Sequence, residues 1–149
     1  MLQSITYVTD ALFISNGDLN CSSNGQVTIE TDGYTFSLID PTGYGFVYYS
    51  TSSAGSTKWI RFTKPSVVEF EVLSYTGTTI LRFDGNTNEA VLTIGSTGKY
   101  RIEYLGTSTK VYLDDTLLTT VTTVDETKNP RFRINANSTL KIKNWLHYY

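Results

Sequence analysis

The stretch GKYRIEYLGTSTKVYLDDTLLTTV, Gly98 to Val121, decides the fold class of this protein. Apolar and polar residues alternate in it, so that Tyr100 and Arg101 are expected on opposite faces. A period of two is typical of half-buried β-strands, because successive side chains point to opposite sides of a sheet. The pair Asp114-Asp115 interrupts the alternation, which predicts a tight turn between two antiparallel strands.

The same alternation recurs along most of the chain, and no window has the apolar spacing of a helix. In SVVEFEVLSY the pattern sets Val68, Phe70 and Val72 against Glu69, Glu71, Leu73 and Tyr75. In the last strand it sets Leu140, Ile142, Leu146 and Tyr148 against Lys141, Lys143, Trp145 and His147. Turn pairs such as Asn24-Gly25 and Asp84-Gly85 separate the runs. Many short strands with such turns indicate an all-β sandwich or barrel.

Length and composition fit one domain over residues 1–149. Aromatic residues make up 13% of the chain and charged residues only 17%, which favours sheets. The net charge of −2, without a run of Lys or Arg, argues against nucleic acid as a partner. No apolar run is long enough to insert into a membrane. The single Cys21 cannot form an internal disulfide.

The N-terminus, MLQSITYVTD, lacks the basic start and apolar run of a signal peptide. If the protein is exported, we therefore expect this chain to be a piece of a larger protein, or to travel as part of a particle.

Three segments carry a family resemblance that covers roughly residues 60–149. The segment KPSVVEFEVLSYTGTTILRFDG is similar to a strand pair in concanavalin A-like sandwich domains, and Gly98 to Val121 resembles the next pair in laminin-G-like domains. The end of the chain, RFRINANSTLKIKNWLHYY, resembles their closing strand, which pairs near the first, here SITYVTDALF. One departure is Asp115, where the family commonly has Gly. Asp tolerates the left-handed conformation better than most residues.

The resemblance implies an antiparallel two-sheet jelly-roll sandwich. Members of this lectin-type family are mostly carbohydrate-binding modules, lectins, adhesion domains and some glycoside hydrolases, and the fold recurs in phage tail and cell-surface proteins. It therefore implies a carbohydrate or host-surface glycan as partner. It also implies a location that is extracellular, on a cell surface or on a virion.

Glu69 and Glu71 are the first candidate site residues. Two carboxylates two apart on a strand share a face, roughly 6.5–7 Å apart along the strand, a separation that could serve a glycosidase. Laminarinase-type hydrolases of this fold carry a third acid on the strand, and it is missing here. The alternative is a ladder of opposite charges with Arg61 and Arg82 on neighbouring strands.

Exposed aromatic rings are the second candidate, since sugars present apolar C–H faces to Tyr and Trp. Trp59 shares a face with Arg61 in the pattern KWIRF, while Tyr44 and Tyr49 lie in or beside a long polar loop and Tyr75 closes the acidic strand. The alternative is that these rings pack in the core or cover sheet edges. The predicted ligand-binding set is Trp59, Arg61, Tyr49, Tyr75, Glu69, Glu71 and Arg82.

A calcium site is the one metal that the sequence suggests. In DGNTNE, the residues Asp84, Asn86 and Asn88 place oxygen side chains at alternate positions, and calcium binds six to eight such oxygens. The further ligands and the terminal acid of the full calcium-loop motif are absent. A hairpin turn explains the same residues without an ion, and Asp10 with Asp18 is a weaker second site. His147 is the only histidine, which excludes a three-His zinc site.

Three hypotheses of function follow. The first is a non-catalytic module that recognises cell-surface or polymeric glycan and needs no cofactor, with a structural calcium ion at Asp84, Asn86 and Asn88 left open as an alternative to a plain hairpin turn. The second is a structural or assembly domain of a phage tail fibre or surface protein, in which exposed aromatics form contacts in a homo-oligomer. The third, a glycoside hydrolase, requires a second acid pair in a cleft.

Overall fold

The computed structural model describes residues 7–9, 19–21, 24–49, 66–82, 91–104, 108–121 and 131–148. These residues form thirteen strands. The strands are β1 (Tyr7–Thr9), β2 (Leu19–Cys21), β3 (Gly25–Glu30), β4 (Gly33–Leu38), β5 (Tyr44–Tyr49), β6 (Ser66–Thr76), β7 (Thr79–Arg82), β8 (Val91–Thr93), β9 (Gly98–Tyr104), β10 (Thr109–Leu113), β11 (Thr116–Val121), β12 (Arg131–Asn135) and β13 (Thr139–Tyr148). Within these ranges there is no helix long and apolar enough to cross a membrane.

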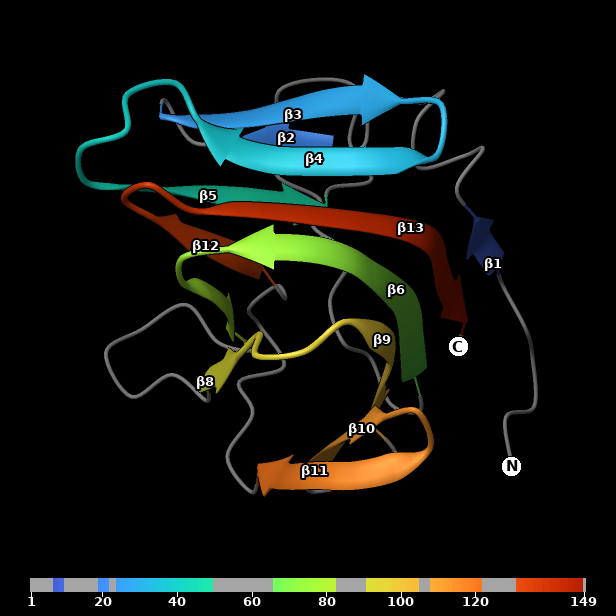
Figure 1. Ribbon diagram of the computed structural model, residues 1–149. Helices are drawn as coiled ribbons and strands as arrows, with labels where there is room; N and C mark the ends of the chain where they lie inside the picture. The colour runs from blue at the N-terminus through green and yellow to red at the C-terminus, as the bar shows by residue number, and fades with distance from the viewer. Residues whose placement is uncertain are drawn as a thin grey trace.

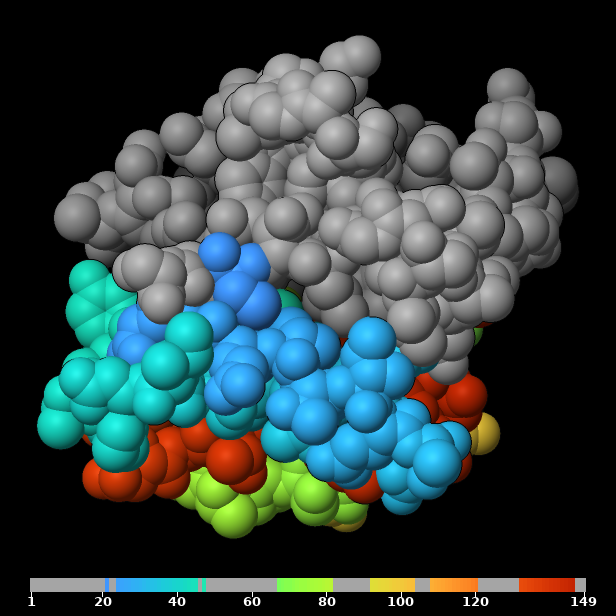
Figure 2. All heavy atoms as spheres, turned by 90° about the horizontal axis from the view of Figure 1, so that it is seen from above, coloured from blue at the N-terminus to red at the C-terminus, as the bar shows by residue number. Residues whose placement is uncertain are grey.

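The strands form two antiparallel sheets (Figure 1). The eight-stranded sheet has the order β11-β10-β9-β6-β13-β4-β3, with β1 beside the end of β13, and the five-stranded sheet has the order β2-β5-β12-β7-β8. In the view from above, spheres of β3, β13 and β6 follow one another toward the lower edge, in the order of the larger sheet (Figure 2). The predicted all-β two-sheet sandwich is thereby confirmed.

The closing strand β13 lies inside the larger sheet and has partner strands on both sides. It pairs with β6 along one edge, while β4 and then β1 pair along the other. Tyr7 lies opposite Tyr148, so the closing strand does pair with the first strand, as the family resemblance implies.

The core lies between the sheets and is built around Phe70. Its ring stacks on Tyr100 with centroids 5.4 Å apart, meets Phe132 edge-on at 5.5 Å and stacks on Trp145 at 5.8 Å. These rings come from β6, β9, β12 and β13, so both sheets contribute to one cluster. The buried residues packed around it are Tyr34, Phe36, Val47, Val68, Val72, Leu81, Ile94, Ile102, Val111, Ile134, Leu140 and Ile142.

The tight turn predicted between β10 and β11 is confirmed at Asp114 and Asp115, whose φ values are 46° and 66°. Two successive residues with positive φ define a type I′ turn, which matches the twist of a hairpin. The hairpin brings Asp114 back beside Lys99 on β9. There the backbone N–H of Asp114 donates a hydrogen bond to Lys99 O at 2.9 Å.

Two β-bulges change which side chains face the core, relative to the alternation that the sequence predicts. On β6 the partner of Lys141 is Ser74 and the partner of Ile142 is Val72, so Leu73 is an extra residue. Beyond it Tyr75 is turned onto the core side, opposite the buried Leu140. The prediction that Tyr75 shares a face with Glu69 and Glu71 is therefore wrong, because alternation fails at the bulge.

The second bulge lies on β13 at Asn144, which has a φ of 56°. Trp145 then enters the core at 5% exposure, and Leu146 turns to the outer face with Lys143. The predicted grouping of Leu146 with Leu140 and Ile142, and of Trp145 with the lysines, is wrong for the same physical reason.

Arg82 lies in the other sheet from Glu69 and Glu71. After β6 the chain turns at Gly77, with a φ of 64°, and enters β7 of the five-stranded sheet. There the backbone of Arg82 is opposite that of Arg131. The predicted charge ladder across neighbouring strands of one sheet is therefore wrong with respect to Arg82.

Candidate functional site

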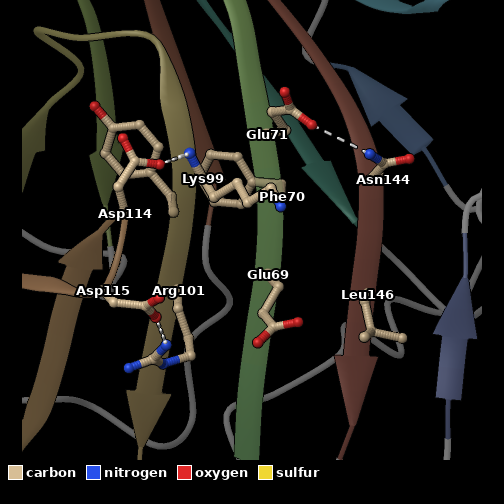
Figure 3. Close-up of a pocket in the computed structure, with 10 residues that line it drawn as sticks. Glu69, Phe70, Glu71, Lys99, Arg101, Asp114, Asp115, Asn144 and Leu146 are labelled. Carbon is tan, nitrogen blue, oxygen red and sulfur yellow. Dashed lines mark hydrogen bonds and ion pairs between the residues drawn. The ribbon is translucent and has the colours of Figure 1, made fainter.

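A hollow of about 420 Å³ lies on the outer face of the larger sheet, where β9, β6 and β13 run side by side (Figure 3). Its lining is Glu69, Phe70 and Glu71 from β6, Lys99, Tyr100 and Arg101 from β9, Asp114 and Asp115 from the hairpin turn, and Asn144 and Leu146 from β13. The volume is at the smaller end of the roughly 300–1,000 Å³ of ligand pockets. It accommodates a short part of a ligand rather than a long chain.

Cross-strand register brings the charges of the hollow together. Glu69 is paired with Arg101, and Glu71 is paired with Lys99 on one side and Lys143 on the other. Residues in register have Cβ atoms roughly 4.5–5.5 Å apart and point to the same face. Positive and negative residues therefore alternate across β9, β6 and β13. Glu69 and Glu71 do lie in a ladder of opposite charges, but its observed cations are Lys99, Arg101 and Lys143 rather than the predicted Arg61 and Arg82.

Arg101 is held on three sides. Its Nε donates to Glu103 Oε1 at 2.9 Å, and its Nη1 donates to Asp115 Oδ1 at 2.6 Å. The guanidinium also lies over the ring of Tyr112, 4.3 Å from the centroid. The hydrogen bond to Asp115 is the main reason why the pKa of Arg101 is raised above its usual value. These contacts fix the position of the Arg101 guanidinium at the edge of the hollow.

The opposite wall depends on the bulge at Asn144. The Asn144 Nδ2 donates to Glu71 Oε2 at 3.2 Å, and the Lys143 Nζ lies 3.7 Å from the same oxygen. The same backbone turn exposes part of Leu146, which adds an apolar surface beside the carboxylates. One bulge thus supplies both a polar clamp on Glu71 and the apolar part of the wall.

Asp114 is positioned by backbone contacts. Its Oδ1 accepts a hydrogen bond from Lys99 N at 2.9 Å. Gly98 has a φ of 131°, and a Cβ there would lie 2.7 Å from Asp114 Oδ2, so a side chain at this position would displace the carboxylate. Glycine is therefore required where the hairpin turn meets β9.

Aromatic rings contribute little surface to this hollow. Phe70 and Tyr100 line it, yet each is only 2% exposed and its ring belongs to the core. Tyr75 is half-buried against the core, and its hydroxyl donates to Gly95 O at 2.8 Å. As far as the described residues go, the lining of the hollow therefore offers hydrogen-bonding and charged groups and little aromatic surface.

The structure brings together only part of the predicted ligand-binding set. Glu69 and Glu71 line the hollow, whereas Tyr75 does not. Trp59 and Arg61 lie outside the described residues, and only the backbone of Tyr49 and Arg82 is described. Their predicted role in binding stays a prediction.

The calcium prediction also stays a prediction, because Asp84, Asn86 and Asn88 lie outside the described residues, as does the weaker pair Asp10 and Asp18. Among the residues that are described, no group of three or more His, Cys, Asp or Glu side chains could hold a metal ion.

Sequence reasoning missed the other eight residues of the lining, of which Phe70 and Tyr100 belong to the core. Lys99, Arg101, Asp114 and Asp115 come together because the strands β9 and β10 form a hairpin, and the turn at Asp114-Asp115 carried that signal. Asn144 and Leu146 had no such signal, because an alternating pattern does not reveal where a bulge reverses it.

Comparison with known proteins gives likeness of structure only. No protein-family model and no curated protein matches the sequence. The structure is similar to the carbohydrate-binding module CBM66 from Bacillus subtilis, with a TM-score of 0.59 and 14% identity over 89% of this chain and 96% of that one.

Two further structures are similar. A sialidase has a TM-score of 0.59 and 11% identity over 89% of this chain, which spans 17% of the sialidase chain. A presumed glycosyl hydrolase from Parabacteroides distasonis has a TM-score of 0.57 and 11% identity, over 95% of this chain and 98% of that chain. These likenesses support the β-sandwich fold, which is shared with a carbohydrate-binding module.

Proposed function

We propose that this chain is a non-catalytic carbohydrate-binding module and that its ligand is a cell-surface or polymeric glycan bound in the hollow of the larger sheet. The observation that carries the proposal is the lining of that hollow. Carboxylates that accept and cations that donate lie beside one another on neighbouring strands of the sheet. The likeness in fold to a carbohydrate-binding module supports it.

The chemistry of the lining suits hydroxyl groups. A sugar hydroxyl both donates and accepts, and it can bridge a carboxylate to a neighbouring guanidinium or ammonium. Glu69 and Arg101 form such a pair in register, and Glu71 with Lys99 forms another. Hydrogen bonds to charged groups contribute more than neutral ones. Because Leu146 offers the ligand only a small apolar surface, we expect modest affinity per site, strengthened by several copies on a polymer.

The non-catalytic role is part of the proposal. Glu71 is bound through one oxygen to Asn144 and lies beside Lys143, so this carboxylate is arranged as a fixed acceptor. The third strand acid of laminarinase-type hydrolases is missing from the sequence. We further propose that the module acts outside the cell, on a cell surface or on a virion.

The test is binding of the protein to an array of neutral and charged glycans, followed by calorimetry on the best ligand. Glu69→Gln keeps the shape of the side chain and removes the charge, and we expect about 10–100-fold weaker binding. Glu30→Gln removes one carboxylate at the β3 edge, away from the hollow, and serves as the matched control. Circular dichroism establishes that each variant is folded.

Two outcomes count against the proposal in different ways. If no glycan binds, the carbohydrate-binding role is wrong. If a glycan binds equally well to Glu69→Gln and to the unchanged protein, the role stands but the hollow is not the site. The assembly role in a tail fibre or surface protein stays a prediction, and a stable oligomer in light scattering would favour it.

A further inference from the structure

Resting on the proposed function, we infer that the hollow is selective for neutral glycans and discriminates against sugars that carry carboxylate or sulfate groups. The inference names the class of ligand for this site. It follows from the charge of the lining, from the engagement of Arg101 and from the hydrogen-bonding capacity that is left.

The lining is acidic. Among the residues that the structure describes, four lining carboxylates, those of Glu69, Glu71, Asp114 and Asp115, face two cations, those of Lys99 and Arg101, so the net charge of this set is −2. Glu103 and Lys143 lie beside the lining, bonded to Arg101 and near Glu71 respectively, and their charges cancel. An anionic sugar entering this hollow is therefore repelled more than it is attracted.

Arg101 is not arranged as a clamp for an anion. A guanidinium binds a carboxylate or sulfate best through two parallel N–H bonds. The Nη1 of Arg101 donates to Asp115 (Figure 3), and its Nε donates to Glu103, so two edges of the guanidinium already hold protein carboxylates. A ligand anion would have to displace Asp115 or share a donor with it, next to a second negative charge.

The lining oxygens that are not used in hydrogen bonds within the protein favour ligand groups that can donate a hydrogen bond as well as accept one. Glu71 uses Oε2 for Asn144 and Lys143, which leaves Oε1 as an acceptor. Asp114 uses Oδ1 for the Lys99 N–H, which leaves Oδ2. Hydroxyls can donate to these oxygens, whereas a ligand carboxylate or sulfate offers only acceptors to them. The same acceptors thus attract neutral polyols and repel anions.

Lys99 is the residue that could oppose this selectivity. Its ammonium has no carboxylate partner within the described part of the chain, and it is exposed at the edge of the hollow. The lining contains four carboxylates, and Arg101 forms an ion pair with only one of them, Asp115. The single ammonium of Lys99 cannot balance the other three. We therefore expect Lys99 to donate to a hydroxyl, and not to reverse the charge preference.

The experiment uses ligand pairs that differ in charge alone. Neutral oligosaccharides of several stereochemistries are compared with the same oligosaccharides oxidised at C6 to uronates, by calorimetry at low and high salt. The expected result is that the neutral member of each bound pair binds about tenfold or more tightly at low salt. The difference should shrink at high salt, because screening weakens repulsion between exposed charges.

Four variants test where the effect arises. Asp115→Asn and Glu69→Gln each remove one negative charge from the lining, and both should reduce the ratio of neutral to uronate affinity at least threefold. Glu30→Gln changes the net charge of the protein equally but lies outside the hollow, and its ratio should not change. Lys99→Gln should increase the discrimination further.

Each result decides one of the two proposals. If uronates bind as tightly as the neutral sugars, or more tightly, the selectivity is wrong while the carbohydrate-binding role survives. If the ratio changes equally in Glu30→Gln and Asp115→Asn, the preference arises from overall charge and the inference is also overturned. If neither member of any pair binds, the proposed function fails and the selectivity fails with it.

Discussion

Asn144 and Trp145 are neighbours in β13, yet Asn144 is exposed with a φ of 56° while the Trp145 side chain is 5% exposed in the core. The left-handed backbone at Asn144 forms a bulge, and beyond it the side chains of the strand point to the opposite faces from those that alternation predicts. It turns the indole inward, Leu146 outward and the Asn144 amide toward Glu71. One residue thus links the packing of the core to the wall of the hollow.

The first prediction concerns this backbone conformation. Asn144→Gly and Asn144→Val both remove the hydrogen bond to Glu71, but only valine resists a positive φ. We expect Asn144→Val to have a free energy of unfolding about 1–2 kcal/mol below that of Asn144→Gly. Urea denaturation followed by circular dichroism measures it. Equal stability of the two variants would show that the bulge is not held at positive φ.

The second prediction concerns Phe70, which contacts three aromatic rings from both sheets. Phe70→Ala removes these contacts and leaves a cavity, so we expect a loss of about 3–5 kcal/mol in the free energy of unfolding. Phe70→Leu removes fewer atoms and should lose less. A loss below 1 kcal/mol in Phe70→Ala, measured by chemical denaturation, is incompatible with this ring as the centre of the core.

The third prediction concerns pH and the ion pairs of Lys141, whose Nζ lies 2.5 Å from Glu30 Oε2 and 2.7 Å from Asp32 Oδ1. The hydrogen bond to Lys141 is the main cause that lowers the pKa of both carboxyls, and Asp32 is the main cause that raises the pKa of Lys141. A lowered carboxyl pKa adds stability above its ordinary value of about 4, and this stability is lost as the pH falls through the folded-state pKa.

Lys141→Met should therefore be less stable than the unchanged protein at neutral pH, and the difference should shrink below about pH 4. On the alkaline side the contribution of Lys141 persists up to its ordinary pKa of about 10.4 and is lost only as the pH rises through the raised value. Unfolding midpoints across this range test it. Lys110→Met is the control, since no ion pair joins Lys110 to the other described residues. A constant difference down to pH 2 would exclude the ion pairs as its cause.

The fourth prediction concerns Trp59. A sugar that contacts Trp59 should change the tryptophan fluorescence, and Trp59→Ala should abolish this change and weaken binding. Trp145 is buried and supplies a constant signal in both proteins. An unchanged affinity in Trp59→Ala would remove Trp59 from the predicted binding set, while leaving the hollow as the proposed site.

The fifth prediction concerns catalysis. Incubation with β-glucans should release no reducing ends, because the lining of the hollow arranges its carboxylates as acceptors in ion pairs and hydrogen bonds. If reducing ends are released and Glu69→Gln abolishes their release, the protein is a glycoside hydrolase and the proposed non-catalytic role is wrong. Release that persists in Glu69→Gln would indicate a contaminating enzyme.

Alternation along the chain was sufficient to predict most strands, an all-β sandwich or barrel and the Asp114-Asp115 turn, while the choice of a two-sheet sandwich came from the family resemblance. These features depend on neighbours in sequence, because successive side chains of a strand point to opposite faces and apolar ones are buried. Glu69 and Glu71 could be placed on an outer face for the same reason, with Phe70 between them in the core.

The remaining features were decided by tertiary structure. Alternation cannot show that Leu73 and Asn144 are extra residues, because a bulge exists only relative to the partner strand. Nor can it show that the chain crosses to the second sheet at Gly77, which separates Arg82 from Glu69. Strand pairing brings Lys99, Arg101 and Leu146 to Glu69, and only the packed fold determines which distant strands pair.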